Sequence, residues 1–358
     1  MTAPNFWRGK RVLLTGHTGF KGSWLALRLN HLGAELTGFA LAPPTRPSLF
    51  EIARAGEGMR SIIADIRDAA AIHAAVAEAQ PEVIFHLAAQ PLIRQAYADP
   101  AATYATNVMG LVNLLEAVRR CDAVRVLVNV TSDKCYENRE WFWGYREHDR
   151  LGGRDPYSSS KACAELVTAA YRDSYLGDGN MERRAPVAVA TARAGNVIGG
   201  GDWAKDRLVP DILDALDADR PVIIRHPQAV RSWQHVLEPL SGYLLLAEAL
   251  WREGPAHTGA WNFGPADEDA RPVRWLVEKL AQHWPGRLRW EIDNGPHPHE
   301  ACQLRPDCSK ARIQLGWRPR WNLETALARI AAWHQAYLEG RQDMRAVTLE
   351  EIRNHAAE

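Results

Sequence analysis

The chain has 358 residues, of which 46% are apolar and 24% are charged, and its 43 basic residues balance its 43 acidic ones. This composition excludes a disordered or membrane-embedded chain and indicates a soluble globular protein of about two domains. Because there is no basic excess and no run of like charges, we expect no nucleic acid among its partners.

We expect no targeting signal at the N-terminus. Its first apolar run begins at Val12 and is four residues long, too short for a signal peptide or a membrane span, so no membrane partner is expected. The cysteines are odd in number and lack CxxC or metal-ligand spacing, which predicts reduced thiols in the cytoplasm. They are Cys121, Cys135, Cys163, Cys302 and Cys308. The histidines of HPHE, 297–300, fit a solvated loop better than a metal site, so no metal is predicted.

Short apolar runs alternate with helical patterns in the first half of the chain. The apolar runs are RVLLT (11–15), ELTGFA (35–40), SIIA (61–64), EVIFHLA (82–88) and VRVLVNV (124–130), and the helical patterns cover 20–32, 68–79 and 100–120. Alternation of this kind implies right-handed crossovers and a parallel sheet. We therefore predict an α/β fold with a Rossmann-type, doubly wound domain over residues 1–190.

Glycine-rich and proline-rich loops interrupt the pattern in the second half. Helices are predicted at roughly 208–217, 236–252, 272–283 and 322–338. We expect residues 191–358 to form mainly a smaller C-terminal α/β lobe that binds the substrate, with 233–263 returning to the first domain. The insert at 137–155 is too polar and glycine-rich for a regular element, but its aromatic residues predict that it packs over something.

Three glycines, Gly16, Gly19 and Gly22, stand between the first strand and the first helix. Glycines there permit a tight turn, and the helix N-terminus offers free N–H groups and a positive dipole end to a pyrophosphate. A tight turn without a ligand is the alternative. The strand before the glycines and the helix after them favour dinucleotide binding.

The Gly-x-x-Gly-x-x-Gly spacing resembles that of the extended short-chain dehydrogenases/reductases, the family of NAD-dependent epimerases and dehydratases. FHLAAQ at 85–90 resembles their fourth-strand motif beside the cofactor, and ADI at 64–66 resembles the site where an aspartate meets the adenine. The resemblance implies NAD as cofactor. The implied contacts are Gly16, His17, Gly19, Phe20, Gly22, Asp65, Ile66, Leu87, Ala88, Ala89, Asn107, Tyr157 and Lys161.

The region after the second strand departs from the NAD pattern. An acidic residue there usually binds the ribose hydroxyls of NAD, but FALAPPTRPS has Ala42 near that place and Arg46 close by. NADP is therefore kept as an alternative. His17, inside the glycine loop, is also expected to crowd the pyrophosphate.

Tyr157 and Lys161 are four residues apart in DPYSSSKACAEL and share one helical face. A tyrosine ionises near pH 10, at about its reference value, so it needs a neighbouring cation to act as a base, and Lys161 supplies one. With Ser132, which follows a predicted strand, they resemble the family's serine, tyrosine and lysine triad. This triad implies redox chemistry at a secondary alcohol: Tyr157 takes the hydroxyl proton, and Ser132 binds the developing carbonyl.

Oxidation of the alcohol alone does not explain why Asp133 and Lys134 follow Ser132. In sugar-nucleotide 4,6-dehydratases the residue after the hydroxyl protonates the leaving C6 hydroxyl, and the next residue, often glutamate, removes the C5 proton. SDK resembles the CDP-glucose 4,6-dehydratase branch, with Lys134 either as that base, its pKa depressed by Lys161 and the nicotinamide, or as a cation that stabilises the enolate. A solvated pair that ends a strand is the alternative without chemistry.

The resemblance extends over about residues 10 to 338, and RSWQHVLEPLSGYL is its most discriminating segment. Arginines suit a diphosphate and aromatic faces suit a base, and the second half offers both. The predicted substrate contacts are Arg193, Asn196, Asp202, Trp203, Arg207, Arg231, Gln234 and His235.

The implied function is that of a lyase converting CDP-D-glucose to CDP-4-dehydro-6-deoxy-D-glucose and water, in the supply of sugars for lipopolysaccharide O-antigen. A 4,6-dehydratase or 4-epimerase for another nucleotide sugar is a rival, although an epimerase needs no elimination pair. A cofactor-sensing protein without turnover is a second rival, although it would be expected to lack part of the triad. The helices at 100–120 and 157–176 are apolar on more than one face, which predicts a homodimer.

Overall fold

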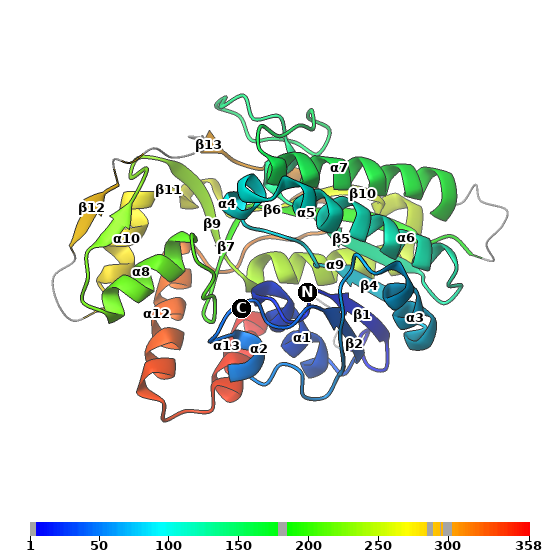
Figure 1. Ribbon diagram of the computed structural model, residues 1–358, viewed down its shortest axis with the longest axis horizontal. Coiled ribbons are helices and arrows are strands. Elements are labelled where there is room, and N and C mark those ends of the chain that lie inside the picture. Colours follow the sequence, from blue (N-terminus) through cyan, green and yellow to red (C-terminus); the bar gives the residue numbers. More distant parts are fainter. Residues whose placement is uncertain (1–4, 178–184, 285–288, 294, 296–302) are drawn as a thin grey trace.

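The computed structural model of the protein describes residues 5–177, 185–284, 289–293, 295 and 303–358. A seven-stranded parallel sheet in the order β10-β6-β5-β4-β1-β2-β3 forms the centre of the larger domain (Figure 1). Its strands are β1 (Arg11–Thr15), β2 (Glu35–Ala40), β3 (Arg60–Ile63), β4 (Val83–His86), β5 (Val126–Val130), β6 (Ala188–Ala194) and β10 (Gly259–Phe263). The predicted Rossmann-type fold is confirmed.

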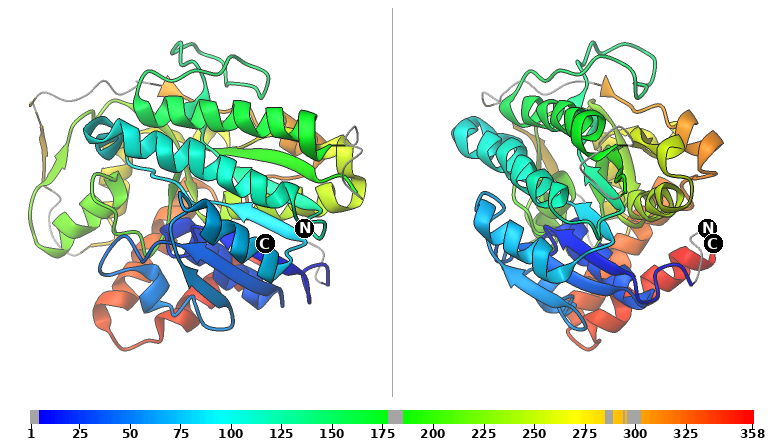
Figure 2. Two further views of the ribbon diagram at one scale, coloured as in Figure 1. Left: turned by 45° about the vertical axis from the view of Figure 1, so that its right-hand side comes forward. Right: turned by 90° about the vertical axis from the view of Figure 1, so that its right-hand side faces the viewer.

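Helices cover both faces of this sheet (Figure 2). Successive strand residues point to opposite faces, so Val12 and Leu14 join one core and Leu13 joins the other. The first face packs against α1 (Phe20–His31), α9 (Leu237–Glu253) and α13 (Met344–Ala357). The second face packs against α3 (Ala69–Ala79), α6 (Gly110–Arg119) and α7 (Pro156–Tyr171).

The predicted helix at 100–120 consists of three consecutive segments. It begins as α5 (Pro100–Tyr104), passes through a π-helical turn η1 (Ala105–Met109) and continues as α6. The short helices α2 (Leu49–Ile52) and α4 (Ile93–Ala98) were not predicted, nor was α13.

A smaller lobe stands at one end of the sheet domain. Its main sheet contains β7 (Asn196–Ile198), β9 (Val230–His235), β11 (Ala270–Pro272) and β13 (Gln303–Leu304), and a second sheet pairs β8 (Val222–Ile224) with β12 (Trp290–Ile292). Its helices are α8 (Leu208–Asp217), α10 (Val273–Ala281) and α12 (Leu323–Glu339), close to the predicted bounds, while α11 (Ser309–Gln314) packs against β10. Of the segment 233–263, α9 and β10 lie on the larger sheet, whereas Trp233 to His235 end β9 of the lobe.

The insert at 137–155 forms a loop without helix or strand, as predicted. Tyr145 stacks between Tyr136 and Trp141, with ring centroids 5.2 Å apart in both pairs. The aromatic residues therefore hold the loop against the body of the protein. Among the helices of the described residues, none combines the length and the apolar character needed to cross a membrane.

Candidate active site

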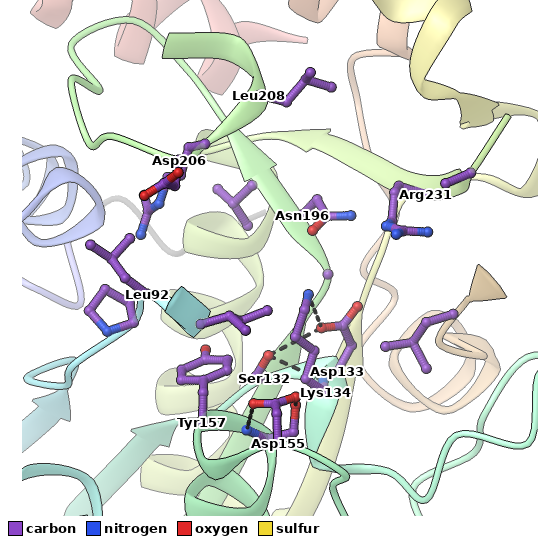
Figure 3. A pocket seen from close by; sticks show the side chains of 18 of the residues that line it. Leu92, Ser132, Asp133, Lys134, Asp155, Tyr157, Asn196, Asp206, Leu208 and Arg231 are labelled. Atoms are coloured by element: carbon purple, nitrogen blue, oxygen red, sulfur yellow. Dashed lines mark hydrogen bonds and ion pairs between the residues drawn. The ribbon is translucent and has the colours of Figure 1, made fainter. Parts of the chain in front are cut away.

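A cavity of ≈ 1190 Å³ opens between the carboxyl ends of the central strands and the smaller lobe (Figure 3). The sheet domain lines it with Ser132, Asp133, Lys134 and Tyr157, and the lobe lines it with residues of β7, α8 and β9. A volume of this order holds a ligand larger than a typical drug, for which pockets measure roughly 300–1,000 Å³.

The turn after β5 brings the reactive residues together. β5 is fully buried, and Ser132 caps the short 3-10 turn η2 (Asp133–Cys135) by accepting a hydrogen bond from the backbone N–H of Lys134 at 3.2 Å. The Ser132 hydroxyl donates to Oδ1 of Asp133 at 3.1 Å, and Nζ of Lys134 lies 3.8 Å from the same oxygen (Figure 3). The side chain of Asp133 is 3% exposed and that of Lys134 is 28% exposed, so the amine is the more accessible group.

Tyr157 lies in the first turn of α7, whose N-terminus is capped by Asp155. Burial raises the pKa of the Tyr157 phenol to about 12, although hydrogen bonding with Ser132 acts in the opposite direction. Lys161, one turn later, donates from Nζ to the Val130 carbonyl at 3.4 Å, and burial lowers its pKa to about 8. The phenol is therefore neutral near pH 7 in this structure.

Lys21 also lines the cavity and was not predicted as a site residue. It occupies the first turn of α1, directly after the glycine loop. Its pKa is lowered to about 7, first by burial and then by the nearby charges of Arg207, Lys161 and Lys134. A lysine between Gly19 and Gly22, beside the predicted diphosphate site, was the signal in the sequence that the prediction did not use.

The glycine loop fits the diphosphate of a dinucleotide. Gly16 has φ +76°, and a Cβ placed there would lie 2.7 Å from the Ala88 amide nitrogen. A Cβ at Gly22 would lie 2.0 Å from the Gly16 carbonyl oxygen, so the loop closes against its own helix only without side chains. The first turn of α1 has neither a capping side chain nor an acidic residue, which leaves its N–H groups and its positive dipole end for an anion.

The end of β4 is held beside this loop by hydrogen bonds. The amides of Leu87 and Ala88 donate to the Thr15 hydroxyl, both at 3.1 Å. Ala89 follows them on the same segment. Asn107, in the π-helical turn, binds the backbone of Gln90 through its carbonyl and amide groups, at 2.8 and 3.1 Å. Asn107 is buried at 3% exposure, so its side chain positions the β4 loop from behind.

Three residues predicted to contact the cofactor have their side chains engaged within the protein. The carboxylate of Asp65 accepts from Arg67, which lowers its pKa, and the side chain of Ile66 is buried against Gly110. The imidazole of His17 is fully buried and bonds to the Ser61 hydroxyl at 2.7 Å. The expectation that the His17 ring crowds the pyrophosphate is not supported, because the ring lies beneath the loop against Gly38 of β2.

The lobe places four of the predicted substrate residues on the cavity wall, namely Asn196, Asp202, Arg207 and Arg231. NH1 of Arg207 lies 2.9 Å from Oδ2 of Asp202, which orients the guanidinium. Figure 3 shows Asn196 and Arg231 on the lobe side of the pocket, across from Tyr157.

Arg193 does not line the cavity. It is 3% exposed in β6, and its Nε and NH2 donate to both carboxylate oxygens of Glu165 at 2.9 and 2.8 Å. A guanidinium that is paired inside the fold is not available to a diphosphate, so Arg193 is left out of the substrate site.

Three other predicted substrate residues also lie off the cavity wall. Trp203 packs against Trp333, Gln234 donates to the Phe263 carbonyl at 2.8 Å, and His235 is fully buried. Gln234 and His235 support the wall from behind, because Trp233, which precedes them on β9, does line the cavity.

Metal ligation finds no support within the residues that the structure describes, where histidine, cysteine and carboxylate groups do not cluster in threes. Residues 297–300, considered above for a metal site, lie outside that set.

Comparisons with known proteins agree with this geometry. Residues 13–330 match the family model for GDP-mannose 4,6 dehydratase. The chain is 54% identical over 355 residues to a CDP-glucose 4,6-dehydratase of Salmonella typhimurium, covering 99% of this chain and 98% of that protein. It is 33% identical to a UDP-glucose 4-epimerase of Mycolicibacterium smegmatis, covering 89% of this chain and 96% of the relative.

Among solved structures, the fold is similar to that of a dTDP-glucose 4,6-dehydratase of Bacillus anthracis in complex with NAD. The TM-score is 0.74 at 20% identity, with 92% of this chain and 97% of the other covered. At this identity the likeness supports the fold alone, whereas the match over residues 13–330 assigns the family. The chain belongs to the GDP-mannose 4,6 dehydratase family of the extended short-chain dehydrogenases/reductases.

Proposed function

We propose that the protein is an NAD-dependent lyase that converts CDP-D-glucose to CDP-4-dehydro-6-deoxy-D-glucose and water. The observation that carries this proposal is the turn Ser132–Asp133–Lys134, which faces the same cavity as Tyr157 and adds an acid and an amine to the redox triad. The 54% identity to a CDP-glucose 4,6-dehydratase over nearly the whole chain supports the choice of nucleotide.

In the proposed reaction, NAD held by the glycine loop and Lys161 would supply hydride transfer from C4 of the hexose to C6. Tyr157 receives the proton of the C4 hydroxyl, and Ser132 hydrogen-bonds to the oxygen as it becomes a carbonyl. The ketone makes the C5 proton acidic. Lys134 removes that proton, Asp133 protonates the C6 hydroxyl as it leaves, and Lys134 returns its proton to C5.

The glycine loop and the end of β4 are the proposed cofactor site. The backbone at Gly16, Gly19, Phe20 and Gly22 would hold the diphosphate, since the cradle there excludes side chains. Leu87, Ala88 and Ala89 would lie along the cofactor, and Lys161 would bind the nicotinamide ribose. No carboxylate follows β2 at the place that usually selects NAD, so NADP is the competing cofactor in the assay below.

The nucleoside diphosphate would bind at the lobe side of the cavity. Arg207 and Arg231 are the proposed diphosphate ligands, because a guanidinium binds phosphate oxygens with two hydrogen bonds. Asn196 and Asp202 offer amide and carboxylate groups for the sugar and ribose hydroxyls. This arrangement would place the hexose between the arginines and Tyr157.

We also propose that the protein acts in the cytoplasm as a homodimer and supplies O-antigen synthesis. The exposed apolar side chains Met109 (54%) and Leu166 (60%) mark the outer face of the η1–α6 and α7 helices, where a second copy would pack. Light scattering after size-exclusion chromatography should give twice the chain mass of 40.0 kDa. A mass of one chain would contradict the dimer.

The test of the activity is an assay with four nucleotide sugars. CDP-glucose, dTDP-glucose, UDP-glucose and GDP-mannose are incubated separately with the purified protein and either NAD or NADP. Mass spectrometry should show loss of water from CDP-glucose with NAD, at the highest rate of the set. Preference for another nucleotide would move the assignment within the dehydratases, and a change of C4 configuration without loss of water would make the protein an epimerase.

A further inference from the structure

The proposed dehydration, on which this inference rests, creates an unequal proton count between two side chains. Tyr157 receives the proton of the C4 hydroxyl, whereas Asp133 gives a proton to the departing C6 hydroxyl. Lys134 takes the C5 proton and returns it, so its count does not change. Each turnover would therefore leave Tyr157 with one proton too many and Asp133 with one too few, unless a proton passes between them.

The Ser132 hydroxyl lies between these two residues. It donates to Oδ1 of Asp133 at 3.1 Å and accepts the Lys134 backbone N–H at 3.2 Å. A hydroxyl has one proton and two acceptor sites, so one acceptor site of Ser132 remains for the Tyr157 phenol. Figure 3 shows the phenol oxygen of Tyr157 on the side of Ser132, and both residues line the cavity.

Ser132, Asp133 and Tyr157 are all buried from solvent. Ser132 is 6% exposed, Asp133 is 2% exposed and Tyr157 is 8% exposed. With a nucleotide sugar in the cavity, the hexose would cover the remaining exposure. Exchange of protons with bulk water during the reaction would then be slow compared with transfer among these neighbouring buried groups.

We propose that Ser132 relays a proton from Tyr157 to Asp133, so that the proton removed from O4 becomes the one that leaves in the released water. As the C4–H bond gives up its hydride, the O4 proton moves to the Tyr157 oxygen, the phenol proton moves to Oγ of Ser132, and the serine proton moves to Oδ1 of Asp133. Tyr157 and Ser132 each gain and lose one proton. Asp133 becomes the carboxylic acid that protonates O6 when the C6–O6 bond breaks, and no proton enters from solvent.

The protonation states of the structure suit this direction of transfer. Burial holds the pKa of Tyr157 at about 12, so the relay starts from a neutral phenol and does not require a phenolate. The Ser132 O–H already points to a carboxylate oxygen, which is the acceptor that the last transfer needs. The same carboxyl group thus serves as the final base of the oxidation and as the acid of the elimination.

Two variants separate the relay from the ordinary role of Ser132 in binding the carbonyl. Ser132→Ala removes both functions, and Ser132→Thr keeps a hydroxyl. Turnover of CDP-glucose is measured against imidazole concentration at constant pH and ionic strength. We expect turnover by the wild type and by Ser132→Thr to be independent of imidazole, and turnover by Ser132→Ala to fall about 10²-fold and to recover several-fold as imidazole rises.

A loss in Ser132→Ala that imidazole does not relieve would overturn the relay, because only the carbonyl bond would then have been removed. A second measurement uses the wild type alone: a pH indicator in weakly buffered solution follows the first turnover in a stopped-flow instrument. The relay predicts no transient release of protons, and release of about one proton per site would contradict it. Absence of any dehydration by the wild type would instead refute the proposed function.

Discussion

Lys134 is the residue whose role is least constrained by its contacts. Its Nζ lies 3.8 Å from Oδ1 of Asp133 and the side chain is 28% exposed to the cavity. An amine in that place acts on the C5 proton only when it is neutral, whereas an ammonium would stabilise the enolate. The two roles differ in whether the group must lose a proton.

Replacement by arginine distinguishes the two roles of Lys134, because a guanidinium keeps the charge and does not deprotonate in proteins. If Lys134 is the base, Lys134→Arg should lower turnover of CDP-glucose by about 10²-fold or more, to the level of Lys134→Met. Thermal melting of both variants controls for folding. Activity of the arginine variant well above that of the methionine variant would assign Lys134 as a cation.

Lys21 is the second amine of the cavity and has the more perturbed environment. Its pKa is lowered to about 7, mainly by burial and also by the cations Arg207, Lys161 and Lys134, while Asp133 acts in the opposite direction. The folded protein therefore disfavours the charged form. Between about pH 7 and the reference pKa of about 10.4, the unfolded chain binds more protons, so this group makes the free energy of unfolding increase with pH.

The change Lys21→Met should remove this unfavourable charge. We expect the variant to have a higher melting temperature than the wild type at pH 7, and the difference should shrink towards pH 10, where the folded lysine is neutral and the unfolded lysine comes close to its pKa of about 10.4. Lys205→Met, at an exposed position of the lobe, is the matched control and should show no such trend. An equal shift at both pH values would mean that packing, and not charge, explains the effect.

The sequence predicted that Ser132, Asp133, Lys134 and Tyr157 belong to one site, and the structure places all four on the same cavity. Their catalytic roles stay predictions. The prediction failed for Arg193, since nothing in the letters shows that Glu165, 28 positions earlier, faces it across the core. A buried arginine with an internal partner and a ligand-binding arginine look the same in sequence. The burial of the His17 ring beside Ser61 was hidden for the same reason.

At the scale of elements, the turn from β1 into α1 fixes the place of the cofactor site. Gly22 lies inside α1, where its missing side chain lets the Gly16 carbonyl approach the helix. Gly19 stands at the start of the same helix with φ −78°, which any residue adopts, and a Cβ there would have only one contact, 3.5 Å from the Gly16 carbonyl oxygen. A close backbone contact therefore requires glycine at position 22, whereas the backbone and the space at position 19 would accept a Cβ.

Alanine at each position tests this difference. Gly22→Ala places a Cβ 2.0 Å from the Gly16 oxygen, so the loop must move, and we expect a lower melting temperature and loss of NAD binding measured by calorimetry. Gly19→Ala is the matched control and should melt like the wild type or higher, because alanine favours the helix start without a clash. Equal melting temperatures for both variants would show that the loop is not closed as described.

The elements predicted correctly are those with long apolar runs or strong helical periodicity, such as β5 and α7. Several of those missed are short, because strands of three residues such as β7 and β8 carry too little pattern to be recognised, whereas the missed helix α13 has 14 residues. The π-helical turn η1 was also invisible, since it preserves the periodicity on both sides while it moves Asn107 under the β4 loop. Tertiary contacts, and not local preference, create these features.

At the scale of the whole molecule, the cavity joins the two halves of the chain. The sheet domain supplies the reactive turn, and the lobe supplies the arginines that would hold the diphosphate. An ion pair between Arg94 of α4 and Asp206, 3.1 Å long, bridges the two parts beside the cavity. Its members are about two-fifths exposed, so the pair stabilises the fold by less than about 1 kcal/mol and is free to rearrange when a substrate binds.

The C-terminal helix connects both parts from behind. Glu351 of α13 lies 3.1 Å from the buried His235 at the end of β9, and His355 lies 3.0 Å from Glu238 of α9. β9 carries Arg231 and Trp233, which line the cavity. The last helix of the chain thus supports β9, a strand of the proposed substrate-binding wall, although α13 itself does not line the cavity.

Two buried histidines next to the central strands should make the whole fold sensitive to acid. Burial lowers the pKa of His17 to about 4 and that of His86 to about 3, so both are neutral in the folded protein. As the pH falls below the unfolded value of about 6.5, the unfolded chain binds protons that the fold excludes, and the free energy of unfolding decreases until the folded pKa is reached. For His17 this loss amounts to about 3 kcal/mol by pH 4.

The variant His17→Gln keeps a group that can hydrogen-bond to Ser61 and cannot be protonated, so it isolates the contribution of the ring. Urea unfolding between pH 7 and pH 4.5 should show a smaller loss of stability in this variant than in the wild type, with little difference between them at pH 7. His148→Gln, at an exposed position, should leave the wild-type pH dependence unchanged. If His17→Gln lost stability as steeply as the wild type, the ring would have to be accessible to protons in the fold, and the compact packing of the glycine loop on β2 and β3 would be wrong.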